Sequence, residues 1–260
     1  DQCRIISPPE AGISQLFKFV KEHYKLRWTF LLFLNLLIYD RRCRFFSLIS
    51  ALGSLKKSQQ NVDLVFTSNT REFALFAETV DVIIPTIGRE KYLYNVLCDL
   101  RSQTHVPTKV IIVEQNPDLA SETSLKYLEN EYWPFKIKHI FTHQTGACQA
   151  RNLAMKYIES KWVFFADDDI RFKQDFLHEA LNVLTYWKIN ASTFNCLADS
   201  QTNDNIHISQ TTIFGSGCSI VKAIILQNIF FKRNFEFGFG EDLDFGMQLR
   251  NQGTDVIFCP

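Results

Sequence analysis

Short apolar runs alternate with amphipathic segments over residues 80–169, and this alternation constrains the fold more than any other feature of the chain. The runs are rich in β-branched and aromatic residues, as expected of buried strands. They are VDVIIPT at 80–86, KVIIVEQN at 109–116, FKIKHIFTH at 135–143 and KWVFFADDD at 161–169. Helices are predicted between them, at 89–104, 121–132 and 146–160. Strands that alternate with helices predict an α/β fold, with a mostly parallel sheet flanked by helices.

Polar residues follow each of the four runs, and the predicted topology brings them to one edge of the sheet. Parallel strands point the same way, so their carboxyl ends share an edge, and ligands of such sheets bind in the crevice beyond it. The groups expected there are Pro85-Thr86, Glu114-Gln115-Asn116, Thr142-His143 and Asp167-Asp168-Asp169. The sequence therefore predicts a ligand site that contains three consecutive carboxylates.

The three consecutive aspartates at 167–169 carry the strongest chemical signal in the chain. One interpretation is a solvated loop that caps the helix predicted at 171–184, but a single Asp is enough for a cap. Three carboxylates at the ligand edge favour a functional role, because they repel one another unless a cation lies near them. Carboxylate oxygens suit Mg²⁺ or Mn²⁺, and either ion would bridge them to a diphosphate.

Residues 1–78 precede the regular pattern and are predicted to form an N-terminal extension or small subdomain of unassigned role, before a main domain at 79–260. Their clearest feature is the apolar stretch LRWTFLLFLNLLIY at 26–39, which is shorter than the roughly 20 residues of a membrane-spanning helix. A buried helix or core strand is the favoured interpretation. An interfacial anchor beside Arg41, Arg42 and Arg44 stays open, and it would give peripheral membrane contact. A strand is also predicted at 62–69.

Charge and cysteine content exclude some functions and favour one compartment. The 28 Lys and Arg residues balance 28 Asp and Glu, so the basic surface of a nucleic-acid-binding protein is not expected. The seven cysteines are scattered, without a C-x-x-C pair or a Cys/His spacing typical of a metal site. Reduced thiols are the simplest interpretation, and they favour a cytoplasmic location, with or without membrane association.

Four segments in order resemble the signatures of family 2 glycosyltransferases of the GT-A fold: VDVIIPTIGR, KVIIVEQN, GACQARNLAMKYIESKWVFFADDD and GFGEDLDFGMQLRNQG. The resemblance covers residues 80–260. It implies transfer of a sugar from a nucleotide diphosphate donor to an acceptor hydroxyl, with a divalent metal, Mn²⁺ or Mg²⁺. The Q-x-x-R-W motif of processive relatives is absent, which implies a non-processive enzyme. The family also implies a carbohydrate or lipid-linked glycan acceptor and a role in surface polysaccharide assembly.

The resemblance assigns roles on the donor side residue by residue. Asp169 and Asp167 match the metal ligands. Glu114 matches the acidic residue that contacts the base or ribose in relatives, many of which have Asp at this position. For Arg151, a structural salt bridge to the aspartates is almost as well supported as a nucleotide contact. The residues that match the donor-binding positions are Pro85, Thr86, Arg89, Glu114, Gly146, Arg151, Asn152, Asp167 and Asp168.

A second acidic cluster, Glu241 and Asp242, opens the last predicted helix. Carboxylates in a first helical turn are favoured by the helix dipole, so simple capping is one interpretation. The resemblance implies instead that Asp242 is the catalytic base of an inverting reaction and that Glu241 holds the acceptor or orients Asp242.

Two other functions compete with the glycosyltransferase hypothesis. A metal-dependent sugar-phosphate nucleotidyltransferase would also place carboxylates at a strand end, but such enzymes usually carry a Gly-rich basic loop after the first strand. Here that loop reads PTIGRE, with one Gly and one Arg. A non-catalytic sugar- or nucleotide-binding module would be expected to lose a carboxylate, and both acidic clusters are intact. The transferase hypothesis is therefore favoured. Donor sugar, nucleotide base, acceptor and oligomeric state stay open at this stage.

Overall fold

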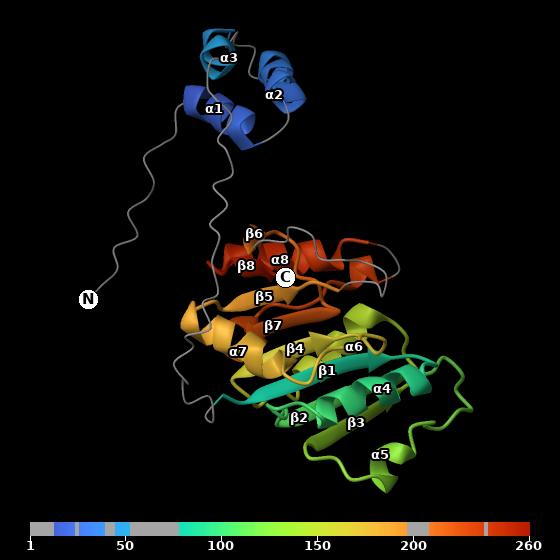
Figure 1. The fold of residues 1–260 in the computed structure, drawn as a ribbon. Helices are drawn as coiled ribbons and strands as arrows, with labels where there is room; N and C mark the ends of the chain where they lie inside the picture. The colour runs from blue at the N-terminus through green and yellow to red at the C-terminus, as the bar shows by residue number, and fades with distance from the viewer. Residues whose placement is uncertain (1–12, 24–25, 40–44, 53–77, 197–207, 237–238) are drawn as a thin grey trace. The chain divides into compact units, whose positions relative to one another are not determined.

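A computed structural model describes residues 13–23, 26–39, 45–52, 78–196, 208–236 and 239–260 (Figure 1). The chain divides into two compact units, Asp1–Leu64 and Val65–Pro260. The domain boundary predicted after residue 78 stays a prediction. Residues 53–77, which include the strand predicted at 62–69, lie outside the described residues.

The described part of the first unit forms three helices, α1 (Ile13–His23), α2 (Leu26–Tyr39) and α3 (Phe45–Leu52). Its buried core is small and consists of Phe17, Leu48 and Ala51. The apolar stretch of α2 is helical, but the favoured interpretation of it as a buried segment is wrong: Thr29 is its one residue classed as buried. The physical reason is that α2 is apolar on all sides, whereas packing against two short helices can bury only one face. Among the described residues, no helix combines the length and the apolar character needed to cross a membrane.

The second unit is built on an eight-stranded sheet in the order β3-β2-β1-β4-β7-β5-β8-β6. The four predicted strands appear as β1 (Val80–Thr86), β2 (Lys109–Gln115), β3 (Lys136–Thr142) and β4 (Trp162–Ala166), and all four run parallel. The other strands are β5 (Ala191–Phe194), β6 (Ser209–Thr211), β7 (Cys218–Lys222) and β8 (Val256–Cys259). Strand β7 pairs antiparallel with both β4 and β5. The predicted α/β fold with a mostly parallel sheet is confirmed.

Helices cover both faces of this sheet. Helices α4 (Glu90–Arg101) and α7 (Phe176–Tyr186) contribute to one hydrophobic cluster, on the face turned toward the viewer in Figure 1. Helices α6 (Ala147–Met155) and α8 (Glu241–Asn251) contribute to the cluster on the opposite face. Two short 3₁₀ helices, η2 (Ala223–Leu226) and η3 (Arg233–Phe235), lie between β7 and α8 in the sequence. The core is therefore two apolar layers, separated by the sheet.

One predicted helix is much shorter in the structure. The helix expected at 121–132 is reduced to α5 (Tyr127–Asn130). The carboxylate of Glu114 accepts hydrogen bonds from the Ser124 amide and from the hydroxyls of Thr123 and Ser124, at 2.6 to 3.0 Å. These bonds give the segment a non-helical alternative, because Ser and Thr side chains compete with helical hydrogen bonding.

Strand β4 alternates between the two apolar layers. Trp162, Phe164 and Ala166 belong to the cluster with α4 and α7, while Val163 and Phe165 belong to the cluster with α6 and α8. Successive residues of an extended chain point to opposite faces. If this period continues past Ala166, the aspartates that follow must also diverge.

Candidate active site

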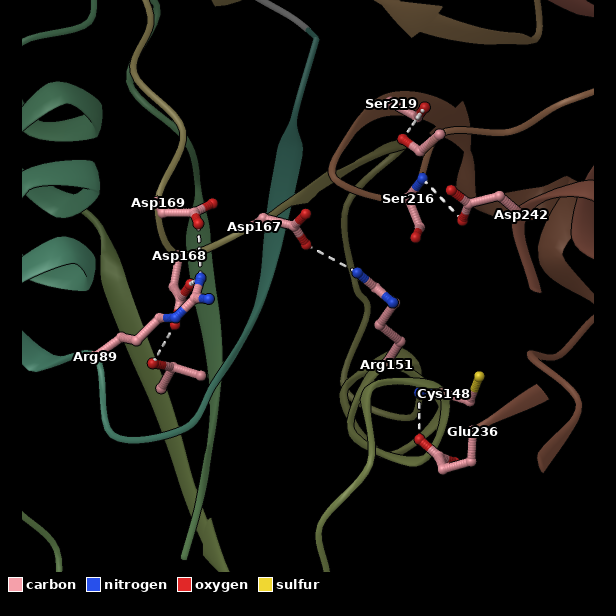
Figure 2. A network of polar contacts seen from close by, with 12 residues as sticks. Arg89, Cys148, Arg151, Asp167, Asp168, Asp169, Ser216, Ser219, Glu236 and Asp242 are labelled. Atoms are coloured by element: carbon pink, nitrogen blue, oxygen red, sulfur yellow. Dashed lines mark hydrogen bonds and ion pairs between the residues drawn. The ribbon is translucent and has the colours of Figure 1, made fainter. Parts of the chain in front are cut away.

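The aspartates after β4 diverge in part: Asp167 lies toward Arg151, while Asp168 and Asp169 both lie beside Arg89 (Figure 2). Asp167 lies toward α6, where Arg151 Nη2 donates to its Oδ1 at 2.8 Å. Asp168 turns to the other side, where the Thr86 hydroxyl donates to its Oδ2 at 2.6 Å. Asp169 accepts from Arg89 Nη1 at 2.6 Å. The pleat of β4 therefore separates Asp167 from Asp168, while Asp168 and Asp169 share the Arg89 guanidinium, whose positive charge offsets their mutual repulsion.

Asp168 connects two loops of the site rather than facing solvent. It is 5% exposed, and its second oxygen accepts from Arg89 Nη1 at 3.2 Å. Burial raises the pKa of Asp168 above its usual value, although the bonds from Thr86 and Arg89 act in the opposite direction. The carboxylate joins the end of β1 to the end of β4, and it holds Arg89 beside Asp169.

Asp167 and Asp169 have side chains that a ligand can reach, with exposed fractions of 43% and 45%. Each gives one oxygen to an arginine, Arg151 and Arg89 respectively. Asp167 also lies so close to Gly217 that a Cβ there would overlap its carboxylate. Within the described parts of the chain, no three His, Cys, Asp or Glu side chains form a metal-binding group. Two hard carboxylates do fit Mg²⁺ or Mn²⁺ when substrate phosphates complete the coordination.

Arg151 forms the predicted salt bridge to the aspartates. It is 5% exposed, and its guanidinium carbon lies 5.5 Å from the centre of the Phe231 ring. Its Nε is buried and is one of the few buried side-chain polar atoms in the described residues without a hydrogen-bond partner. A contact between Arg151 and a nucleotide stays a prediction.

Three other residues predicted to border the nucleotide have partners inside the protein. His139 Nε2 donates to Glu114 Oε2 at 2.8 Å, and Glu114 also accepts from Thr123 and Ser124. Asn152 donates to the Phe231 carbonyl at 2.7 Å and accepts from the Phe231 amide at 2.8 Å. Thr86 gives its hydroxyl to Asp168. Direct ligand contacts by these side chains therefore stay predictions, while their roles in holding the loops are visible.

Asp242 lies in the first turn of α8, as predicted, together with Glu241. Its Oδ1 accepts from the amide of Ser216 at 3.1 Å. Burial raises the pKa of Asp242, although the bond from Ser216 lowers it in part. A carboxylate with one oxygen held by a backbone amide and a raised pKa is suited to accept a proton near neutral pH.

The pKa of the Cys148 thiol indicates which charged groups lie near the start of α6. The pKa of Cys148 is raised to about 11, first by burial and then by the charges of Glu236, Glu241 and Asp242, while Arg151 lowers it. Cys148 is in the first turn of α6, three residues before the arginine that binds Asp167. Helix α6 therefore lies beside both carboxylate groups of the site.

Glu236 was not predicted as a site residue from the sequence, yet its carboxylate is bound at the N-terminus of α6. Its carboxylate accepts from the amide of Cys148 at 2.8 Å, at the N-terminus of α6 (Figure 2). A weak signal existed, because Gly146 begins a predicted helix without a Ser, Thr, Asp or Asn at the capping position. Such a helix needs an acceptor from elsewhere, but nothing local indicates which residue supplies it.

Comparison with known sequences agrees with this geometry. Residues 81–243 match the sequence model of glycosyl transferase family 2. A poly(ribitol-phosphate) β-N-acetylglucosaminyltransferase, TarS of Staphylococcus aureus, is 29% identical over 103 residues, which are 38% of this chain and 18% of TarS. The glycosyltransferase GlyA of Streptococcus pneumoniae is 24% identical over 152 residues, 52% of this chain and 21% of GlyA. The chain therefore spans about a fifth of the curated relatives it matches.

Solved structures show the same fold. S. aureus TarS residues 1–349 with UDP-GlcNAc superimposes with a TM-score of 0.56 at 20% identity, covering 70% of this chain and 56% of that one. A mannosyltransferase from Pyrobaculum calidifontis with GDP-Man and Mn²⁺ gives a TM-score of 0.54 at 18% identity, over 70% and 54% of the two chains. At these identities the likeness establishes the fold.

Proposed function

This chain belongs to glycosyl transferase family 2, and we propose that it moves a sugar from a nucleotide diphosphate donor to an acceptor hydroxyl. The predicted family, enzyme class and GT-A type fold are confirmed. One observation carries the proposal: Asp167, one of two half-exposed carboxylates after β4, is held by Arg151 of α6, and the start of the same helix lies near Asp242, a partly buried carboxylate of raised pKa at the start of α8.

On the donor side, Asp167 and Asp169 would hold a divalent cation against the diphosphate, with Arg89 and Arg151 fixing the two carboxylates. When bound, such a cation offsets the negative charge that grows on the leaving phosphate oxygens. The UDP-GlcNAc and GDP-Man complexes of the similar structures support a nucleotide-sugar donor, and one of them contains Mn²⁺. Pro85, at the end of β1, and Gly146, before α6, would border the same nucleotide.

On the acceptor side, Asp242 would act as general base in an inverting, non-processive reaction. It takes the proton of the acceptor hydroxyl while that oxygen bonds to the anomeric carbon, and the bond from this carbon to the diphosphate oxygen breaks on the opposite face. The nucleoside diphosphate leaves with the bonding electrons. The Ser216 amide holds Oδ1 of Asp242, and the other carboxylate oxygen would face the acceptor. Glu241, beside it, would bind the acceptor.

A donor screen tests this function. The protein is incubated with UDP-GlcNAc, UDP-glucose or GDP-mannose, with Mn²⁺ or with EDTA, and released nucleoside diphosphate is measured by a coupled assay. We expect metal-dependent release from one donor, stimulated by a glycan acceptor. Binding without release would indicate a non-catalytic module. Pyrophosphate formed from a nucleoside triphosphate and a sugar phosphate would indicate a nucleotidyltransferase.

The first unit supports a proposal about the location of the acceptor. Helix α2 exposes large apolar side chains, among them Leu31 at 52% and Leu34 at 51%. The sequence from 25 to 57 has one acidic residue, Asp40, against seven basic ones: Lys25, Arg27, Arg41, Arg42, Arg44, Lys56 and Lys57. Apolar surface combined with basic charge is typical of peripheral binding to anionic bilayers. We therefore propose membrane contact and a lipid-linked glycan acceptor, as in surface polysaccharide assembly.

Vesicle flotation measures this contact. The protein should float with vesicles that contain phosphatidylglycerol and less with phosphatidylcholine alone, and salt should weaken the difference because it screens the charges. Leu31→Gln with Leu34→Gln should reduce flotation. Leu119→Gln, at an 81% exposed position of the second unit, is the matched control. Equal flotation of the parent and the double variant would contradict the proposal.

A further inference from the structure

The carboxylate of Glu236 occupies the N-terminus of α6. Its Oε1 accepts from the Cys148 amide at 2.8 Å and its Oε2 accepts from the Gln149 amide at 3.1 Å. The N-cap residue of α6, Gly146, has no side chain to make these bonds. Amides of a first helical turn otherwise lack partners, and the helix dipole favours a negative charge beside them. Glu236 therefore supplies, from 88 residues away in the sequence, the cap that α6 lacks.

The position of Gly146 is shaped around this carboxylate. Its φ of +138° lies in a region that residues with a Cβ rarely adopt. A Cβ at Gly146 would also overlap the Glu236 carboxylate. The Gly146 amide donates to Gln115 Oε1 at 2.5 Å, which fixes the approach to α6 against the end of β2. The backbone conformation of Gly146 and its lack of a Cβ therefore make room for the Glu236 carboxylate.

The segment that ends at Glu236 is held by helices on both of its sides. Toward α6, Asn152 forms two hydrogen bonds with the Phe231 backbone. Toward α8, Lys232 Nζ lies 2.6 Å from Asp244 Oδ1, and Gln248 Nε2 donates to the Phe230 carbonyl at 2.9 Å. Glu236 is the last described residue of this segment that is fixed to α6, five positions before Glu241. Its bonds to the α6 amides therefore anchor the chain to α6 five residues before α8 begins.

We propose that Glu236 is a positioning residue, which places Asp242 and Glu241 relative to the donor carboxylates through its hold on the N-terminus of α6. The same helix carries Arg151, which binds Asp167. Helix α6 is then a common support: its start fixes the acceptor side and its middle fixes the donor side. The catalytic consequence rests on the proposed transferase function, whereas the positioning itself does not.

Hydrogen exchange tests the positioning without any substrate. Glu236→Ala removes the cap, while Glu236→Gln keeps oxygen and size but loses charge. We expect faster amide exchange in Glu236→Ala both at 147–149 and at 241–246, with Glu236→Gln between it and the parent. Glu159→Gln is the control, because Glu159 is 77% exposed and pairs with Lys109 elsewhere on the fold. Faster exchange confined to 147–149 would overturn the proposal and leave Glu236 as a helix cap alone.

Kinetics then separate positioning from donor binding. Glu236→Ala should lower kcat by about 10- to 100-fold, because a displacement of about 1 Å in a reacting group can cost that much. The Kd for UDP or GDP with Mn²⁺ should stay that of the parent, and Glu236→Gln should recover part of the rate. Weakened nucleotide binding with an unchanged kcat would overturn the proposal. If the parent turns over no donor, the transferase function fails, and the exchange experiment still decides the role of Glu236.

Discussion

Replacing Asp242 with Asn is expected to lower sugar transfer by about 10³-fold, the typical contribution of a positioned general base. The amide keeps the size of the side chain and can still accept from the Ser216 amide, so the fold around it should persist. Nucleotide binding should not change, because the donor carboxylates are untouched. Transfer is measured as released nucleoside diphosphate, and binding is measured by isothermal titration.

The pH dependence supplies an internal check on Asp242. Burial raises its pKa, so activity that needs the ionised form should rise with pH through that raised value. The contribution of Asp242 to the free energy of unfolding should change in the opposite direction, decreasing as the pH rises. The contribution of the protonated carboxyl is fully present below the pKa of the unfolded chain and is lost as pH rises through the folded pKa. Above that pKa, Asp242→Asn should therefore melt at a higher temperature than the parent, and the difference should vanish in acid.

A surface carboxylate serves as control for this prediction. Asp255, whose side chain is 58% exposed beside Arg250, can be changed to Asn by the same isosteric step. Asp255→Asn should keep transfer at the level of the parent. Near-parental transfer by Asp242→Asn would show that the base lies elsewhere, with Glu241 as the next candidate.

Replacing Asp169 with Asn is expected to remove the metal-dependent part of nucleotide binding. The loss should reach about 100-fold or more in the presence of Mn²⁺, since even groups that only orient a metal ligand are worth about 10- to 100-fold. Binding without metal should change little. Titration of UDP and GDP with Mn²⁺ and with EDTA measures both parts.

The neighbouring Asp168 offers a control in the same loop. Both of its oxygens face Thr86 and Arg89, and the side chain is buried. Asp168→Asn should therefore leave binding dependent on Mn²⁺. An Asp169→Asn variant that binds nucleotide with full metal dependence would remove Asp169 from the metal site.

The regular half of the sheet was predictable because its signals are local. Each of β1 to β4 is a short apolar run, and the parallel order follows from the helices between them. The antiparallel β7 and the pairing of β5 with β8 were not predicted. Paired residues of β5 and β8, such as Ser192 and Ile257, are 65 residues apart in the sequence. A local sequence pattern therefore does not reveal which strand pairs with which.

The site was predictable in its residue types but not in its contacts. Asp167–Asp169 could be placed at the ligand edge from the sequence, since the carboxyl ends of parallel strands meet at one edge, whereas the role of Glu241 and Asp242 came from the family resemblance and stays a prediction. Which oxygen meets which arginine depends on the pleat of β4 and on the position of α6. Glu114 and Asn152 show the limit clearly, because their side chains are bound to loops 9 to 79 residues away. Glu236 is the same case, a long-range partner without a periodic signal.

The pleat of β4 makes the length of the Asp167–Asp169 loop as important as its charge. A deletion of one aspartate would leave carboxylates at the first two positions after β4 and would bring Ile170 to the third, because each position keeps its own direction. The first aspartate would still turn toward Arg151 and the second would take the buried place beside Thr86 and Arg89, while the half-exposed carboxylate that Asp169 now supplies would be lost. Protein engineers who vary this loop should therefore keep its residue count fixed, and a library of length variants should be far poorer in active members than one of side-chain variants.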